Sequence, residues 1–280
     1  SEIYVNPCFS IFFMNSIIRY DPVNDRLFWL ITWDINQIYY SYLGCYCASY
    51  PYGSLWPETI FTNNQIKDIA VSNVKTIDEH SYFYLARQSS IDVAKSDVLL
   101  YQSVKSITSI GERKRLLYIH TNNLHRIYCI SSTEITWIDG DNYNINNKLS
   151  APFNALNCLA YNPSSDELCL GGYLNVYIYN GSNPQEYISI LMSEGNNDGP
   201  IYRLECFGNV FYASLPSKLE KINPDHTVEL LLTKQNNFIG AGASNPDPNS
   251  GSVVITNMEG ASLETFDSQG VHANLLTGIS

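Results

Sequence analysis

The chain has 280 residues, of which 45% are hydrophobic and 15% are charged, so it carries ample apolar surface for a core and too little charge for disorder. Its formal net charge of -11 argues against nucleic acid and anionic membranes as partners, because both bind clusters of lysine and arginine. The most apolar window, residues 9–18, is shorter than a bilayer span, so no transmembrane segment is expected.

In chain order, pairs of apolar segments recur with a similar spacing. Residues 26–29 are followed by an apolar segment at 37–40, and residues 115–118 are followed by one at 126–129 with the same offset. An apolar anchor recurs at a mean interval of about 45 residues, which is the period of a four-stranded propeller blade. The six anchors are Trp29, Tyr84, Tyr118, Cys169, Phe211 and Val254.

Within the repeats, short apolar runs separated by turn residues predict four strands each. The clearest repeat predicts strands at residues 201–207, 209–215, 218–222 and 227–232. The repeat before it predicts strands at 157–161, 166–172, 175–179 and 186–191, and the last repeat predicts 238–243, 251–256, 262–266 and 272–276. The 21 tyrosines and 11 phenylalanines also favour strands over helices.

A single blade has two apolar faces, and it can bury them only between neighbouring blades. The sequence therefore predicts an all-β fold, a six-bladed β-propeller with four antiparallel strands per blade, in one domain over residues 1–280. No strand pattern identifies how the ring would close. The expected blades cover approximately residues 12–64, 65–102, 103–150, 151–196, 197–236 and 237–280.

The repeat resembles the YWTD repeat, also called the low-density-lipoprotein-receptor class B repeat, in which a Leu-Tyr-Trp-Thr-Asp strand is followed by an isoleucine-centred strand and a glycine. The segment Arg26–Trp29 with Ile38 and Gly44 is most similar to it, and Arg115–Tyr118 with Ile127 comes next. No repeat contains the complete five-residue signature. The resemblance implies an extracellular propeller that binds proteins through one face of its ring.

In a propeller, the loops that join the second strand to the third, and each blade to the next, gather on one face, where binding residues are expected. In this chain those loops are rich in amide and acidic side chains. Asparagine is also an ordinary turn residue, so turn formation is the alternative interpretation of these positions. The candidate binding residues are Asp34, Asn36, His120, Asn122, Asn175, Asn257 and Glu259.

A second candidate is the long aromatic segment between Tyr39 and Phe61. Its candidate binding residues are Tyr50, Tyr52 and Trp56. Exposed aromatic side chains anchor protein interfaces or stack on sugars, because each offers a large rigid area with a polar tip. The alternative is that these side chains pack onto the outer edge of the first blade.

We therefore expect a binding module for a protein partner, with carbohydrate as a further ligand class and with no cofactor. One alternative is a structural repeat unit of an extracellular assembly. The other is a divalent-metal-dependent hydrolase similar to the regucalcin-type lactonases, in which Asp34, Asn122, Asn175 and Glu259 would supply oxygen ligands for calcium or magnesium. No nucleophile elbow or other catalytic constellation appears in the sequence, which favours binding over catalysis.

The cysteines and one sequence triplet favour a secreted or extracellular location. Seven cysteines are an odd number, so at least one is unpaired within the chain. A bridge from Cys8 to Cys45 or Cys47 would need an oxidising compartment, and the alternative is that the thiols serve as small buried apolar groups. Asn180 opens an Asn-Gly-Ser triplet and is a candidate for N-glycosylation.

Overall fold

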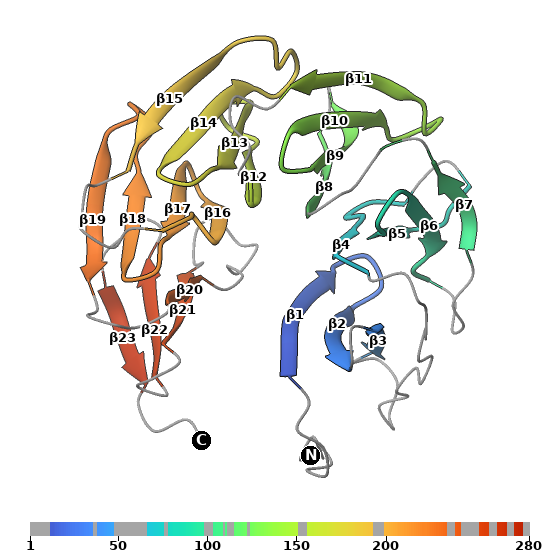
Figure 1. Cartoon of the computed structure of the whole chain (residues 1–280), viewed down its shortest axis with the longest axis horizontal. Helices are drawn as coiled ribbons and strands as arrows, with labels where there is room; N and C mark the ends of the chain where they lie inside the picture. Colours follow the sequence, from blue (N-terminus) through green and yellow to red (C-terminus); the bar gives the residue numbers. More distant parts are fainter. Residues whose placement is uncertain are drawn as a thin grey trace. The chain divides into compact units, whose positions relative to one another are not determined.

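In a computed structural model, the chain is built from β-strands (Figure 1). It forms two compact units, residues 1–118 and 119–280, which we call the N-terminal and C-terminal units and describe separately. Within the ranges that the structure describes, no helix is long and apolar enough to cross a membrane. The described ranges are 12–35, 38–47, 66–75, 78–97, 103–108, 110, 115–121, 124–150, 156–192, 199–233, 239–241, 252–257, 262–267 and 272–276.

The N-terminal unit contains two antiparallel sheets in which each strand pairs with the next one along the chain. The first sheet consists of β1 (Phe12–Asp21), β2 (Arg26–Ile35) and β3 (Ile38–Cys47). The second sheet consists of β4 (Asp68–Val71), β5 (Tyr82–Ala86), β6 (Ile91–Lys95) and β7 (Ser103–Ile107).

Alternating residues of β2 and β5 meet in the core of this unit. Phe28 and Leu30 belong to one buried cluster with Phe83 and Leu85, and the rings of Phe28 and Phe83 lie 5.1 Å apart. Successive side chains of a strand point to opposite faces, so every second residue reaches this cluster. All five residues of β5 are buried, which explains its continuous apolar sequence.

The boundary between the two units falls inside β8 (Arg115–His120), which is the last strand in the sheet order β11-β10-β9-β8. The other strands of that sheet are β9 (His125–Ile130), β10 (Glu134–Asp139) and β11 (Ile145–Ser150). The next sheet consists of β12 (Cys158–Asn162), β13 (Glu167–Gly171), β14 (Asn175–Asn180) and β15 (Tyr187–Leu191). The last two sheets consist of β16 (Arg203–Phe207), β17 (Val210–Ser214), β18 (Lys218–Ile222) and β19 (Val228–Thr233), and of β20 (Ile239–Ala241), β21 (Ser252–Asn257), β22 (Ser262–Asp267) and β23 (His272–Leu276).

The sheets β12–β15 and β16–β19 of the C-terminal unit share one core. Their first strands, β12 and β16, lie against each other (Figure 1). Cys169 and Val176 of the earlier sheet pack in one buried cluster with Leu204 and Phe211 of the later one. Each sheet thus hides an apolar face against its neighbour, as the repeat pattern predicts.

The predicted all-β class is confirmed, and the sheets are β-propeller blades: four-stranded antiparallel meanders that follow one another along the chain. The prediction of six such blades is wrong for the described part of the chain, in which five sheets have four strands and the first has three. In the first sheet, β2 and β3 are strands of ten residues each that pair along their whole length, down to the Ile35 and Ile38 pair next to the turn. Residues 48–64, in which the rest of the first blade is expected, lie outside the described ranges.

The predicted strands agree well with the structure in the fifth sheet, where the segment expected at residues 218–222 is β18. One blade boundary differs. Residues 103–107 form β7, which pairs with β6 and completes the second sheet, whereas the sequence analysis assigns them to the third blade.

Candidate binding surface

The turn between β13 and β14 is one of the second-to-third strand connections in which binding residues are expected. The Gly172 N–H donates to the carbonyl of Asn175 at 2.8 Å and closes the turn. A Cβ on Gly172 would lie 3.0 Å from a ring carbon of Tyr177, so this close packing favours glycine. Tyr173, the next residue in the turn, is 55% exposed.

The segment that leads into the next blade lies against this turn. The Ile201 N–H donates to the carbonyl of Gly172 at 2.9 Å, and the Met192 N–H donates to that of Leu174 at 3.0 Å. Ile201 is fully buried, whereas Tyr202 beside it is 38% exposed. Main-chain hydrogen bonds therefore hold two segments from successive blades together, and each segment contributes an exposed tyrosine.

Asn175 adds a polar group to this surface. We call Tyr173, Asn175 and Tyr202 together the tyrosine patch. The side-chain amide of Asn175 donates to the hydroxyl of Ser189 at 3.1 Å, across the β14–β15 pair, which orients the amide. Exposed aromatic side chains beside an oriented amide suit a protein or sugar ligand, because they combine rigid apolar area with directional hydrogen bonding.

The other candidate residues lie at strand ends or outside the described ranges. Asp34 is the next-to-last residue of β2, His120 ends β8 and Asn257 ends β21. Asn175 is the candidate that lies in the same hydrogen-bonded turn as the exposed Tyr173. For the remaining candidates the interpretation stays a prediction, because Asn36, Tyr50, Tyr52, Trp56, Asn122 and Glu259 lie outside the described ranges.

His120 and His125 face each other at the ends of β8 and β9. Their ring centroids lie 4.8 Å apart in an edge-to-face arrangement, and His125 Nδ1 lies 2.8 Å from Asp141 Oδ1. Desolvation and the neighbouring His125 lower the pKa of His120, and Asp141 acts in the opposite direction. The ring of His120 therefore stays neutral to lower pH than that of a free histidine.

We expect His120 to titrate below the ordinary value of about 6.5. The unfolded state then binds more protons than the folded state in mild acid, so the contribution of His120 to stability is complete above about pH 6.5 and is lost as the pH falls through the folded-state pKa. An NMR titration of the imidazole Cε1–H signals measures this. The change His125→Asn should raise the His120 midpoint and Asp141→Asn should lower it, and a wild-type midpoint at or above about 6.5 would refute the expectation.

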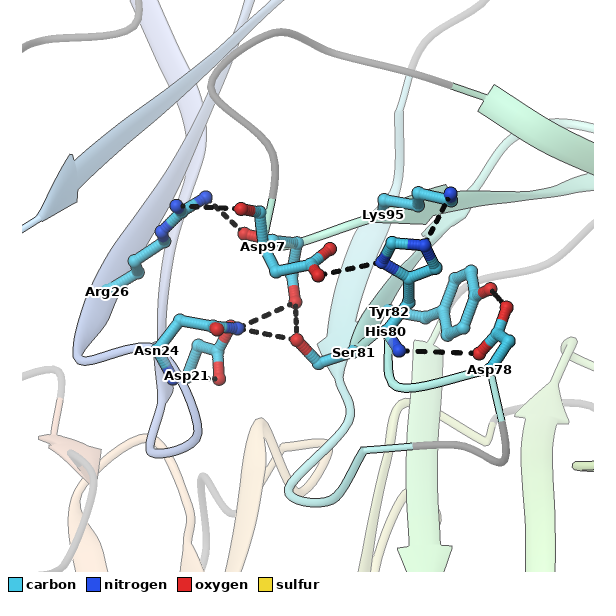
Figure 2. A network of polar contacts seen from close by, with 10 residues as sticks. Asp21, Asn24, Arg26, Asp78, His80, Ser81, Tyr82, Lys95 and Asp97 are labelled. Atoms are coloured by element: carbon cyan, nitrogen blue, oxygen red, sulfur yellow. Dashed lines mark hydrogen bonds and ion pairs between the residues drawn. The ribbon is translucent and has the colours of Figure 1, made fainter.

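A polar network that the sequence analysis did not predict lies in the N-terminal unit (Figure 2). The carboxylate of Asp21, at the end of β1, accepts a hydrogen bond from the side-chain amide of Asn24, in the β1–β2 turn, at 2.8 Å. The same amide donates to the Ser81 hydroxyl, which also accepts the Ser96 hydroxyl at 2.8 Å. Arg26 donates to the main-chain carbonyl of Ser96. The first turn of one sheet is thereby joined to two loops of the next.

His80 lies at the other end of this network, between an acid and a base (Figure 2). Its Nδ1 is 2.8 Å from Asp97 Oδ2, and its Nε2 is 2.8 Å from Lys95 Nζ. Nearby, the Tyr82 hydroxyl donates to the Asp78 carboxylate. Both of these imidazole contacts are to charged groups, which is the pattern of an ion-pair network and not that of a histidine activating a nucleophile.

The turn that begins this network recurs in the C-terminal unit. Residues 20–25 and 161–166 share the pattern Tyr-Asx-Pro-x-x-Asp. In each turn the tyrosine hydroxyl donates to the last aspartate, at 2.9 Å from Tyr20 to Asp25 and at 2.8 Å from Tyr161 to Asp166. Both aspartates have positive φ, 51° and 55°, a conformation that Asp tolerates better than most residues.

Both turns also reach the next sheet. In the N-terminal unit, the side-chain amide of Asn24 donates to the Ser81 hydroxyl. In the C-terminal unit, the side-chain amide of Asn162 donates at 3.1 Å to the side-chain oxygen of Asn209, which lies in the turn between β16 and β17. A polar joint that recurs at equivalent turns of both units is a structural connection between successive sheets and not a single functional site. The repeated hexapeptide is the sequence signal for the turn, whereas the two donors, Asn24 and Asn162, occupy different positions in it.

The described cysteines lie in strands. Cys45 is buried in β3, Cys47 ends that strand, and Cys8 lies outside the described ranges, so the disulfide stays a prediction. Burial raises the pKa of Cys169 well above its ordinary value and that of Cys206 to about 12. Cys169 belongs to the core of the C-terminal unit and the partly buried Cys206 packs against it, which agrees with a role as small apolar groups.

Within the described ranges, no group of three or more His, Cys, Asp or Glu side chains is placed to hold a metal ion. Two of the four oxygen ligands of the hydrolase alternative, Asn122 and Glu259, lie outside those ranges. Calcium binding and lactone hydrolysis therefore stay untested predictions.

A comparison of the sequence with protein-family models finds no match, and a comparison with curated proteins finds no relative. The resemblance to the YWTD repeat thus has no support beyond the sequence pattern. The structure supports the broader class, a protein built from β-propeller blades.

Proposed function

We propose that the protein is a binding module that engages a protein partner through the tyrosine patch of its C-terminal unit. The observation that carries this proposal is the exposure of Tyr173 and Tyr202 on two segments that main-chain hydrogen bonds hold together. Tyrosines on rigid turns provide large contact areas and lose little conformational entropy on binding. Carbohydrate is the alternative ligand, because sugar rings also stack on tyrosine.

One finer feature remains part of this proposal, an extracellular location. Its support is the exposed position of Asn180 at the end of β14, because a glycan acceptor has to lie at the surface.

Selection of a displayed peptide library on the immobilised chain tests the binding proposal. We expect binders to be recovered. The double change Tyr173→Ser and Tyr202→Ser should weaken their affinity at least about tenfold, because truncation of interface tyrosines removes buried contact area.

The matched control is Tyr20→Ser, which removes an exposed tyrosine of the N-terminal unit. It should leave the affinity unchanged, and thermal unfolding of each variant shows whether its fold is intact. Failure to recover any binder, or binders that tolerate the double change, would rule out the tyrosine patch as the binding surface. Binders that respond to a sugar competitor would favour the carbohydrate alternative.

A further inference from the structure

β15 is an apolar strand at the edge of its sheet. It comes last in the order β12-β13-β14-β15. Its residues 187–191 pair with residues 179–175 of β14, so that Tyr187 lies opposite Tyr179 and Leu191 lies opposite Asn175. No strand among the described residues lies on its other side. Tyr187, Ile188 and Leu191 are 46%, 50% and 49% exposed. An edge strand of this kind presents main-chain N–H and C=O groups on which another strand can form.

The ring of Tyr187 is held in place by aromatic neighbours on β14. Its centroid lies 5.5 Å from that of Tyr177 and 5.3 Å from that of Tyr179, both of which are buried. An exposed aromatic side chain that rests on buried ones is a rigid anchor for a ligand. At its other end, β15 adjoins the tyrosine patch, because Leu191 pairs with Asn175.

The outer strands of three other sheets carry charged residues, which commonly protect an edge from unwanted pairing. Lys105 lies in β7, Lys148 in β11 and Glu229 in β19. The sequence of β15 is Tyr-Ile-Ser-Ile-Leu, without a charge. Its main-chain edge is therefore open to pairing in a way that these three strands are not.

The sequence around β15 is entirely acidic in its charges. Residues 149–202 contain no lysine, arginine or histidine, and their charged residues are Asp166, Glu167, Glu186, Glu194 and Asp198. Glu167 is paired with His226 of a neighbouring turn, at 2.7 Å, whereas Glu186 is exposed directly before β15. From outside this segment, Arg126 donates to the carbonyl of Gly181 at 3.2 Å. The exposed carboxylate of Glu186, directly before β15, favours a cationic ligand at this end of the strand.

We propose that β15 binds an extended peptide that carries lysine or arginine, and that the peptide adds to the sheet as a further strand. This inference rests on the proposed binding function and states the chemical class of the partner. The peptide would gain affinity from main-chain hydrogen bonds to β15, place apolar side chains beside Ile188 and Leu191, and place basic side chains near Glu186. A second copy of the chain is the poorer occupant, because pairing of two β15 strands would bring two acidic segments together.

The test measures binding of a fluorescein-labelled peptide that alternates valine with threonine and carries paired lysines at both ends. Fluorescence anisotropy should show saturable binding to the intact chain. Replacing the lysines by glutamates should abolish binding, because the charges would then repel. N-methylation of consecutive peptide bonds should also abolish it, because neither edge of the peptide can then donate main-chain hydrogen bonds.

The change Ile188→Lys adds a protective charge to the exposed edge and should weaken peptide binding at least about tenfold, whereas the matched change Ile188→Thr should retain most of it. Equal thermal unfolding midpoints show that both variants are folded. Absence of saturable binding, binding that survives N-methylation, or equal binding to both Ile188 variants would each overturn the inference. Assembly of the chain into dimers that Ile188→Lys dissolves would assign the edge to a second copy and overturn it as well.

The two proposals fail separately. If the double change Tyr173→Ser and Tyr202→Ser weakens the library-selected binders while the lysine-bearing peptide does not bind, the tyrosine patch stands and strand addition at β15 is wrong. If the peptide binds and responds to Ile188→Lys but the library-selected binders tolerate the tyrosine changes, strand addition stands and the patch is wrong.

Discussion

The change Asp68→Ala is expected to destabilise the N-terminal unit by about 3–5 kcal/mol, the largest loss that we predict for a single substitution. Asp68 is fully buried. Its Oδ2 accepts the Leu116 N–H at 2.8 Å, and its Oδ1 accepts the Ile69 N–H at 2.9 Å and lies 3.5 Å from the Arg19 guanidinium. Alanine would leave both buried N–H groups without this acceptor, and each would lose its hydrogen bond at the full cost of desolvation.

The matched control is Asp68→Asn, which keeps one carbonyl oxygen and should cost clearly less than alanine. Urea unfolding followed by tyrosine and tryptophan fluorescence measures both variants, and the shift of the midpoint at constant slope gives the difference in free energy. Equal midpoints for Asp68→Ala and the wild type would show that this carboxylate does not join the strands as the structure indicates.

The change Gly171→Ala is expected to destabilise the C-terminal unit by about 1–3 kcal/mol, the range for adding a methyl group to a packed core. A Cβ at this position would lie 2.5 Å from Cys158 Sγ and 3.0 Å from Cγ2 of Ile201. Both neighbours are buried, so neither can move aside into solvent. Differential scanning calorimetry should show a lower unfolding temperature.

The double variant Cys158→Ala with Gly171→Ala tests the cause of that loss. Removal of the Cys158 sulfur vacates the space that the new methyl group needs, so the double variant should be more stable than the sum of the two single changes predicts. Additive losses would mean that the alanine at 171 acts through the backbone and not through contact with Cys158.

The strands and the pairing of successive strands could be predicted from the sequence because they depend on local patterns. Residues 218–222, for example, lie between turn residues, and the structure gives them the same bounds as β18. The first sheet differs because β2 and β3 form one long hairpin, and nothing in the period of the repeat fixes the length of a hairpin.

The contacts of the candidate site could be predicted only in part. The sequence identified the β13–β14 turn and Asn175, but the approach of Tyr202 depends on a hydrogen bond between Ile201 and Gly172, which belong to different blades. The joint of Asn24 with Ser81 and Ser96 likewise connects residues far apart in the chain. Such contacts follow from the packing of one blade on the next, which the pattern of a single blade does not determine.

Amide hydrogen exchange of the chain, with and without a library-selected binder, tests the central claim most directly. The proposed function predicts slower exchange at residues 172–175 and 201–202 when the binder is present. It predicts no change in the two Tyr-Asx-Pro-x-x-Asp turns at residues 20–25 and 161–166. Protection confined to those two turns, with unchanged exchange around Tyr173 and Tyr202, would contradict it.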